Sequence, residues 1–377
     1  MSHEVAGLLA VGDEIFRGTL FGAVPSLGKS AGVTGEVVFN TSMSGYQEIL
    51  TDPSYAGQMI CFTSAQIGNT GANVEDLESK KISAHAMIIA NYTPRPSNYR
   101  STMTLNDFLI KNGVVGIHSL DTRALTLYLR DKGVATGMIL PERDESALAD
   151  WKKSRLEKNH DQKYDGIDWI MRVTTQEPYW AKATNGGVAS FKVVAYDYGI
   201  KQQLVRELNQ RGCDVLIVPA DYPSEKVLAE KPNGVFLSNG PGDPALATYA
   251  VKNVKNLLGK LPIFGVCMGH QILAMAMGAK TYKLKFGHRG GNQPVKSFEK
   301  GLVEISSHNH GFAVNELSLP LEAIVTHKNL NDNCVEGIAI PSLNAFSVQY
   351  HPESSPGPHD SSYLFEEFIE KMRAFSR

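Results

Sequence analysis

The residue with the clearest chemical potential is Cys267, which lies in the stretch 261–271 (LPIFGVCMGHQ). Apolar residues precede it, glycines lie two positions before and after it, and an apolar segment at helical spacing continues to Met277. This pattern predicts a buried strand, a tight turn and a helix. At the N-terminus of that helix, backbone N–H groups and the helix dipole would favour a thiolate. We therefore predict that Cys267 is a nucleophile, with a buried core cysteine as the alternative.

A cysteine nucleophile needs a base, and the base needs a group that orients it. The stretch 347–353 (SVQYHPE) contains both. Pro352 disfavours a helix, so His351 and Glu353 should point to the same side of an extended segment, where the carboxylate would stabilise an imidazolium. A surface turn without a catalytic partner is the alternative. Since both stretches follow apolar runs, however, they would meet at one edge of a parallel or mixed sheet.

A third motif, 238–244 (SNGPGDP), also follows an apolar run. Its two glycines let backbone N–H groups come close to a ligand, and fixed N–H donors are what an oxyanion hole requires. The natural pair of donors is the N–H of Gly240 with that of Met268, the residue after the nucleophile. A simple Gly/Pro turn is the alternative, but three motifs at three consecutive strand ends argue against it.

These motifs depend for their positions on a regular alternation of strands and helices that begins at Phe191. Such alternation predicts a doubly wound, mostly parallel sheet with ligands at the carboxyl ends of its strands. Later apolar segments predict an added set of antiparallel strands, followed by a final helix. The expected strands are 191–199, 214–220, one from 234, 262–266, 302–306, 323–327, 337–340 and 345–350, and the expected helices are 200–212, 224–230, 245–258 and 364–372.

The residues before this region indicate a second domain of mixed α/β type. Alternation around Gly12-Asp13 predicts a β-hairpin over 5–22. Residues 142–190 are charged or small and predict one surface helix and a connector. The expected domains are thus 1–141, a connector at 142–190, and the doubly wound α/β domain at 191–377. Further expected strands in the first domain are 35–40, 59–63, 86–90 and 114–118, and its helices are 105–111 and one ending at Gly133.

Composition narrows the class of protein. The 37 basic and 39 acidic residues give no electrostatic footprint for nucleic acid. No run approaches the roughly 18 apolar residues of a membrane span, and the first residues are acidic where a secretory signal would be basic. We predict a cytoplasmic protein that binds neither nucleic acid nor membrane. No metal site is expected, because the four cysteines show no CxxC and no zinc spacing.

The strings GVCMGHQ, YHPE and SNGPGDP together resemble the class I (triad) glutamine amidotransferases over residues 191–377. Strings elsewhere resemble the small, glutamine-hydrolysing subunits of carbamoyl-phosphate synthetases across nearly the whole chain. They include GEVVFNTSMSGYQEILTDPSYAGQ, IGNTGAN, DTRALTLYLRDKG, KFGHRGGNQPV and SHNHGFAV.

This resemblance implies a role for each site residue. Cys267 would attack the glutamine carboxamide to form a γ-glutamyl thioester, His351 would transfer the protons, and Glu353 would orient it. One departure from the family is His308, which stands where glutamine is typical; His270 and His310 are expected to be structural. The residues implied to bind glutamine are Ser54, Gly240, Gly242, Met268, Gln271, Asn309, Gly311 and Phe312.

The resemblance also implies a partner. The first domain would contact a large synthetase subunit of the ATP-grasp type, which would bind ATP and Mg, while this chain would bind no cofactor. The absence of a GxxxxGK[ST] loop agrees with that division. Together the subunits would make carbamoyl phosphate for arginine and pyrimidine synthesis. Two alternatives are an amidotransferase subunit of another synthetase, such as anthranilate or guanylate, and a non-catalytic allosteric subunit.

Overall fold

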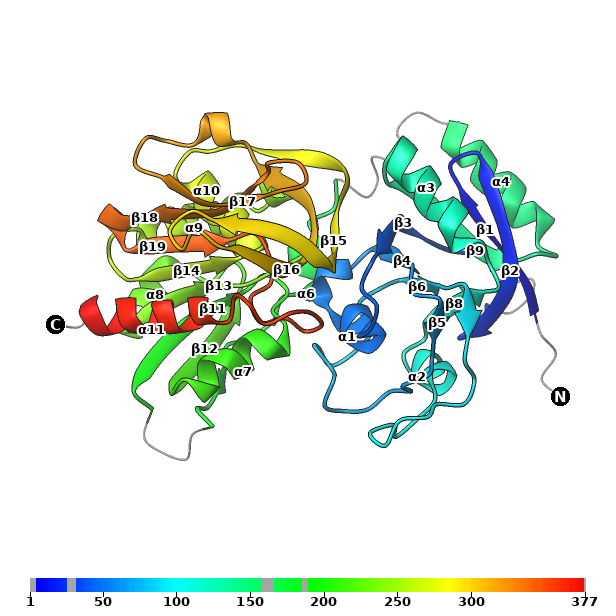
Figure 1. Ribbon diagram of the computed structural model, residues 1–377, viewed down its shortest axis with the longest axis horizontal. Coiled ribbons are helices and arrows are strands. Elements are labelled where there is room, and N and C mark those ends of the chain that lie inside the picture. Colours follow the sequence, from blue (N-terminus) through cyan, green and yellow to red (C-terminus); the bar gives the residue numbers. More distant parts are fainter. Residues whose placement is uncertain (1–4, 26–31, 157–165, 185–188, 376–377) are drawn as a thin grey trace. The chain divides into compact units, whose positions relative to one another are not determined.

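The computed structural model describes residues 5–25, 32–156, 166–184 and 189–375 (Figure 1). The chain divides into two compact units, Met1–Ile167 and Asp168–Arg377. The division falls inside the segment 142–190 that the sequence predicts as a connector. The exact domain limits at 141 and 191 stay predictions.

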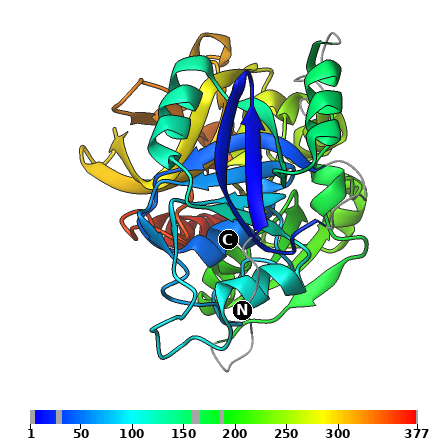
Figure 2. The same cartoon turned by 90° about the vertical axis from the view of Figure 1, so that its right-hand side faces the viewer.

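In the first unit, seven strands form a closed barrel in the order β1-β2-β8-β6-β4-β3-β9. The predicted hairpin is confirmed, because β1 and β2 pair antiparallel around a turn in which Gly12 has a φ of +55°. Figure 2 shows this hairpin in dark blue. The strands are β1 Val5–Val11, β2 Glu14–Gly22, β3 Val33–Asn40, β4 Gln58–Phe62, β6 Ala86–Ile88, β8 Val115–His118 and β9 Ala135–Pro141.

Parallel and antiparallel pairings coexist in this barrel, so the mixed α/β prediction is confirmed. Neighbouring strands are parallel from β3 through β4 and β6 to β8. Strands β2 and β9 pair antiparallel with the two ends of this set, and β1 closes the barrel by pairing antiparallel with both of them. The strand β4 is buried on both faces: Met59 and Cys61 belong to one apolar cluster, and Ile60 and Phe62 to another. A parallel strand covered on both sides is typically a continuous apolar run, as here.

Two helices of the first unit, Leu105–Lys111 and Thr122–Lys132, begin at side-chain caps. The hydroxyl of Thr104 accepts from the N–H of Asp107, and the carboxylate of Asp121 accepts from the N–H of Ala124. The other elements of this unit are α1 Tyr46–Thr51, η1 Pro53–Tyr55, β5 Gln66–Ile67, β7 Asn91–Tyr92, α2 Leu105–Lys111, α3 Thr122–Lys132 and α4 Glu145–Leu156.

The second unit is built on a ten-stranded sheet in the order β10-β12-β11-β13-β14-β19-β18-β17-β15-β16. Its centre, from β12 to β19, is parallel, which confirms the doubly wound prediction. The strands are β10 Tyr179–Ala181, β11 Phe191–Asp197, β12 Cys213–Pro219, β13 Gly234–Leu237, β14 Ile263–Val266, β15 Thr281–Ser297, β16 Val303–Val314, β17 Ile324–Asn329, β18 Val335–Ile340 and β19 Ala345–Val348.

Two apolar layers hold helices against the two faces of this sheet. One layer contains residues of α8 (Ser224–Ala229), α9 (Thr248–Leu257) and α10 (Met268–Ala276). The other contains residues of α7 (Gln202–Gln210) and α11 (Tyr363–Phe375). Shorter elements are α6 Ile170–Val173, η2 Pro244–Leu246, η3 Glu316–Ser318 and η4 Pro341–Leu343.

The predicted antiparallel set differs from the structure in one respect. The segment predicted at 345–350 is β19, which pairs antiparallel with β18 but parallel with β14. A short apolar run carries no information on strand direction, which depends on the connection that precedes it. Among the described residues no helix is long and apolar enough to span a bilayer.

Candidate active site

Cys267 lies at a sharp turn between β14 and α10. Its φ of +54° and ψ of −103° are strained for a residue with a side chain. The glycines on either side leave room for this turn: a Cβ at Gly269 would overlap the carbonyl oxygen of Leu237, and one at Gly265 would crowd the backbone of Gly269. The predicted strand, turn and helix are therefore confirmed, and the thiol stands at the first turn of α10.

His351 and Glu353 follow β19, the strand next to β14. The two side chains are buried, with 2.8 Å between Nδ1 of His351 and Oε1 of Glu353. The backbone N–H of His351 donates to the carbonyl of Ser307 at 2.8 Å, which ties this segment to β16. Because β14 and β19 are parallel neighbours, their carboxyl ends bring Cys267 and His351 to one edge, as the apolar runs predict.

Lys201 completes this group, and sequence reasoning missed it. Its Nζ lies 2.6 Å from Oε1 of Glu353, and both side chains are buried. Its backbone N–H donates to Oδ1 of Asn239, in the loop after β13. The sequence carries one signal for a role of Lys201 in this site, which is its position after the carboxyl end of an apolar strand. Because Lys201 and Glu353 are far apart in the chain, their spacing does not indicate that they are in contact.

Electrostatics make His351 a cation and Glu353 an anion. Burial alone would lower the pKa of His351, but Glu353 and the nearby Cys267 outweigh it and raise that pKa to about 10. Burial alone would raise the pKa of Glu353, but Lys201 and His351 lower it to about 2. Among the described residues, Nε2 of His351 has no hydrogen bond of ordinary geometry, although Cys267 is close enough to act on its pKa. Catalytic hydrogen bonds often tighten only when substrate is bound.

The loop after β13 contains Gly240, whose N–H is one of the two predicted oxyanion-hole donors. Its Ser238 carbonyl accepts from the N–H of Gly269 at 2.9 Å, which joins this loop to the cysteine turn. A Cβ at Gly240 would overlap the carbonyl oxygen of Tyr198. Within the described part of the chain, the backbone N–H groups of Gly240 and Met268 have no backbone acceptor. They are therefore available as donors.

Several residues implied to bind glutamine lie near the thiol. Sγ of Cys267 is 3.6 Å from the carbonyl oxygen of Asn309. The side-chain amide of Gln271 donates to the carbonyl of Phe312 at 2.8 Å and to Oε1 of Gln349 at 3.0 Å. These bonds anchor the Gln271 amide through its nitrogen and leave its oxygen as an acceptor.

The remaining predicted binding residues stay predictions. Gly242 has a φ of +86° in the loop after β13, and Gly311 lies on β16. Ser54 lies in η1 of the first unit, where its N–H donates to the carboxylate of Asp52. His270 is buried against the hydroxyl of Ser347, and burial lowers its pKa to about 3, which supports a structural role.

We expect Lys201→Met to destabilise the protein by about 3–5 kcal/mol, because it removes one of the two cations that pair with the buried carboxylate of Glu353. Lys192→Met is the matched control. That lysine pairs with Glu230 at 2.7 Å on the surface, with side chains 32% and 37% exposed, and such pairs contribute about 0–1 kcal/mol. Urea unfolding of both variants measures the difference.

The pH dependence of the unfolding free energy of Lys201→Met gives a second test of whether Lys201 keeps Glu353 ionised. Because the pKa of Glu353 is lowered in the folded state, its stabilisation is present above about pH 4.3 and lost as the pH falls towards 2. Removal of Lys201 should raise the pKa of Glu353 and make the stability of the variant less sensitive to acid over this range. Equal acid sensitivity in both proteins would show that Lys201 does not hold Glu353 ionised.

Comparison with known proteins gives two family matches. Residues 8–139 match the model described as carbamoyl-phosphate synthase small chain, CPSase domain, and residues 194–371 match glutamine amidotransferase class-I. The carbamoyl phosphate synthase small chain of Syntrophotalea carbinolica is 51% identical, covering 97% of each chain. That of Chlorobaculum tepidum is 48% identical over 98% of each chain.

Two further matches are a chloroplastic relative and a solved structure. The chloroplastic carbamoyl phosphate synthase small chain of Oryza sativa is 49% identical over 92% of this chain and 79% of the relative. Among solved structures, a glutamine amidotransferase from Thermotoga maritima is 18% identical with a TM-score of 0.36, covering 49% of this chain and 85% of that chain.

Proposed function

The chain belongs to the family of carbamoyl phosphate synthase small chains, and we propose that it hydrolyses L-glutamine and passes the ammonia to a large synthetase subunit. One observation carries this proposal. A cysteine on a strained turn at the N-terminus of α10 lies at the same sheet edge as a buried His351–Glu353 pair, which Lys201 holds ionised.

In the first step, Cys267 as a thiolate attacks the carboxamide carbon of glutamine. The carbonyl oxygen becomes an oxyanion, which the N–H groups of Gly240 and Met268 stabilise. His351, as an imidazolium, donates its proton to the amide nitrogen, so that the C–N bond breaks and ammonia leaves. The product is a γ-glutamyl thioester on Cys267 and a neutral His351.

In the second step, water replaces ammonia. His351 takes a proton from the water, and the resulting hydroxide attacks the thioester carbon. The C–S bond breaks, glutamate leaves and the thiolate–imidazolium pair is restored. Throughout both steps Glu353 keeps the imidazole oriented, and Lys201 keeps Glu353 charged.

Residues around the Cys267 thiol bind the α-ammonium and α-carboxylate groups of glutamine. The oxygen of the Gln271 amide is an acceptor for the α-ammonium group. Backbone groups of Gly242, Gly311 and Phe312 are donors and acceptors for the rest of the amino-acid end, together with Asn309. We include Ser54 of the first unit in this set on the strength of the family resemblance alone.

The role that we assign to the first unit is binding of the large subunit. Its sequence holds no catalytic motif, and the relatives are named small chains. We propose that it contacts a large subunit of the ATP-grasp type, which binds ATP and Mg and makes carbamoyl phosphate for arginine and pyrimidine synthesis. The four cysteines form no disulfide with one another, which agrees with a reducing compartment such as the cytoplasm.

Two alternatives are disfavoured by particular observations. An amidotransferase subunit of another synthetase would not match the small-chain model over residues 8–139. A non-catalytic subunit would have no reason to keep the buried charges of Lys201 and Glu353, which cost free energy unless they serve a site.

Reconstitution with the cognate large subunit tests the function. We expect carbamoyl phosphate to form from glutamine, bicarbonate and ATP only when both chains are present. Glutamate release by the isolated chain should be slow and should rise at least about tenfold on assembly, the scale of about 1.4 kcal/mol in barrier. A complex that uses ammonia but never glutamine would contradict the proposal, and a lone chain as fast as the complex would contradict the role of the partner.

A further inference from the structure

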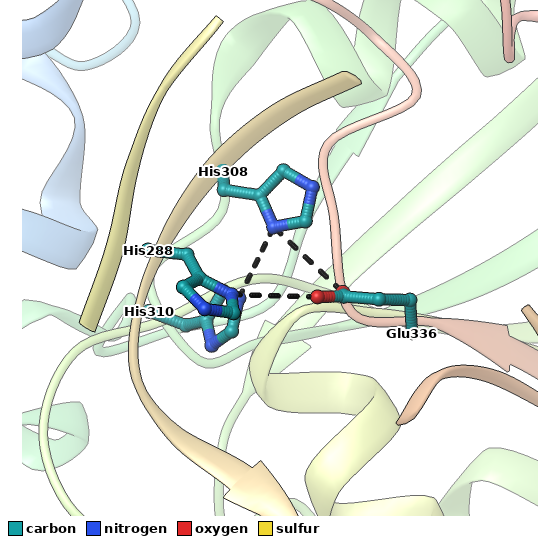
Figure 3. Close-up of side chains that lie close together, drawn as sticks. All are labelled: His288, His308, His310 and Glu336. Carbon is teal, nitrogen blue, oxygen red and sulfur yellow. Dashed lines mark hydrogen bonds and ion pairs between the residues drawn. The ribbon is translucent and has the colours of Figure 1, made fainter. Parts of the chain in front are cut away.

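A second group of buried polar side chains lies in the antiparallel part of the same sheet, beside the segment of β16 that contains Asn309. It consists of His288 on β15, His308 and His310 on β16, and Glu336 on β18 (Figure 3). All four residues are buried, and one nitrogen or oxygen atom from each lies within 4.8 Å of the others. His308 is the residue at which this sequence departs from its family.

The spacing of these atoms suits a small tetrahedral cation. Nδ1 of His308 is 3.2 Å from Nε2 of His310 and 3.7 Å from Oε2 of Glu336. Nδ1 of His288 is 3.4 Å from Oε1 of Glu336. Ligands at about 2.0–2.1 Å from a tetrahedral zinc ion lie about 3.3–3.5 Å from one another. These three distances lie close to that spacing, and one ligand atom from each of the four residues lies within 4.8 Å of the others, so the side chains would draw together to surround one ion.

Each imidazole has its other nitrogen hydrogen-bonded. Nε2 of His288 is 2.8 Å from the carboxylate of Asp332. Nε2 of His308 is 2.8 Å from the hydroxyl of Ser306. The Nδ1–H of His310 donates to the carbonyl of Phe312 at 2.9 Å, which leaves Nε2 with its lone pair facing the group. Metal-binding histidines almost always have such an outer partner, because it fixes the tautomer and the ring orientation.

Two atoms at the centre of the group lack hydrogen bonds. Nδ1 of His288 and Oε2 of Glu336 are buried without a partner of hydrogen-bond geometry among the described residues. An unsatisfied buried carboxylate oxygen is costly and calls for an unseen partner.

We propose that His288, His308, His310 and Glu336 form a zinc site with four protein ligands. Three imidazoles and a carboxylate in tetrahedral spacing favour Zn²⁺ over the harder cations. Because all four positions are filled by protein, the role of the ion is structural. His308 and His310 flank Asn309, whose carbonyl oxygen faces Cys267, so the ion would fix the strand beside the nucleophile.

A competing set shares His288. Its other nitrogen, with Asp332 and the thiol of Cys334, forms a second group with metal-binding potential. The Asp332 side chain is 38% exposed, and this set has three members instead of four. The four-ligand set is better enclosed, and the contact between His288 and Asp332 then acts as its outer support.

Elemental analysis of the untagged full-length chain, purified with its large subunit, is the first test. We expect one zinc per chain after gel filtration. After removal of the zinc with a chelator, Co²⁺ should bind with the strong visible absorption of a tetrahedral site. A wild-type protein that retains no zinc and shows no tetrahedral Co²⁺ spectrum would overturn the proposal, whatever the variants do.

Four variants locate the ion. His308→Gln and Glu336→Gln should lose zinc and should no longer lose thermal stability on treatment with chelator. Cys334→Ser and His327→Gln should keep the zinc, since Cys334 belongs only to the competing set and His327 is a buried histidine of β17 outside both sets. Loss of zinc in Cys334→Ser with retention in Glu336→Gln would assign the ion to the competing set and contradict the four-ligand site.

Discussion

Cys267→Ser is expected to abolish carbamoyl phosphate synthesis from glutamine in the assembled enzyme and to leave synthesis from external ammonia intact. The hydroxyl keeps the shape of the turn, but His351 can hardly deprotonate it, so the loss should be on the order of 10⁴–10⁶-fold. Ammonia bypasses the thiol, because the thiol supplies nothing else to the synthetase. Glutamine should still bind, since its charged ends are held by other residues.

The measurement is a parallel assay of the variant complex with each nitrogen source. Cys334→Ser is the matched control, because its thiol is also largely buried and already bonded to polar partners that a hydroxyl can keep. Loss of both activities in an assembled Cys267→Ser complex would show that this cysteine is structural. Continued use of glutamine would show that the nucleophile is another residue.

His351→Asn is expected to have the second-largest effect. It removes the group that moves each proton, which alone is worth about 10²–10⁴-fold, and it also removes the cation that stabilises the thiolate. Glu353→Gln should reduce turnover less, because the imidazole remains. Steady-state release of glutamate by the three complexes gives this order, and a His351→Asn enzyme within a few-fold of the wild type would refute the triad.

Stability gives an independent check on His351. Its pKa rises to about 10 in the folded state, above the value of about 6.5 in an unfolded chain. Its contribution to stability is therefore complete below about pH 6.5 and is lost as the pH rises towards 10. The difference in unfolding free energy between wild type and His351→Asn should shrink over that range.

The turn at Cys267 and the His351–Glu353 contact were predictable because each lies in a short local pattern. A strand, a turn with glycines and a helix can be read around Cys267, and a proline fixes the relation of His351 to Glu353. The end of an apolar run also indicates which edge of the sheet each motif reaches. Patterns of this kind can be recognised in a single sequence because they depend only on residues that are adjacent in the chain.

The parts that were missed depend on contacts between distant segments. Closure of the barrel requires β1 to pair with β9 and β2 with β8, and no local pattern specifies either. The 17-residue strand β15 contains GHRGGNQ, which has the composition of a loop; pairing with β16 overrides that low strand propensity. Lys201 and Glu336 meet their partners only after the sheet has formed.

The place of β19 in the sheet has a consequence for the newborn chain. Strand β19 lies between β14 and β18 in the sheet, yet it follows both of them in the chain. A nascent or truncated chain that ends before Ala345 therefore carries the thiol of Cys267 without the base that would activate it. Under the proposed function, such a chain would not hydrolyse glutamine until β19 has been made and has inserted between its two neighbours.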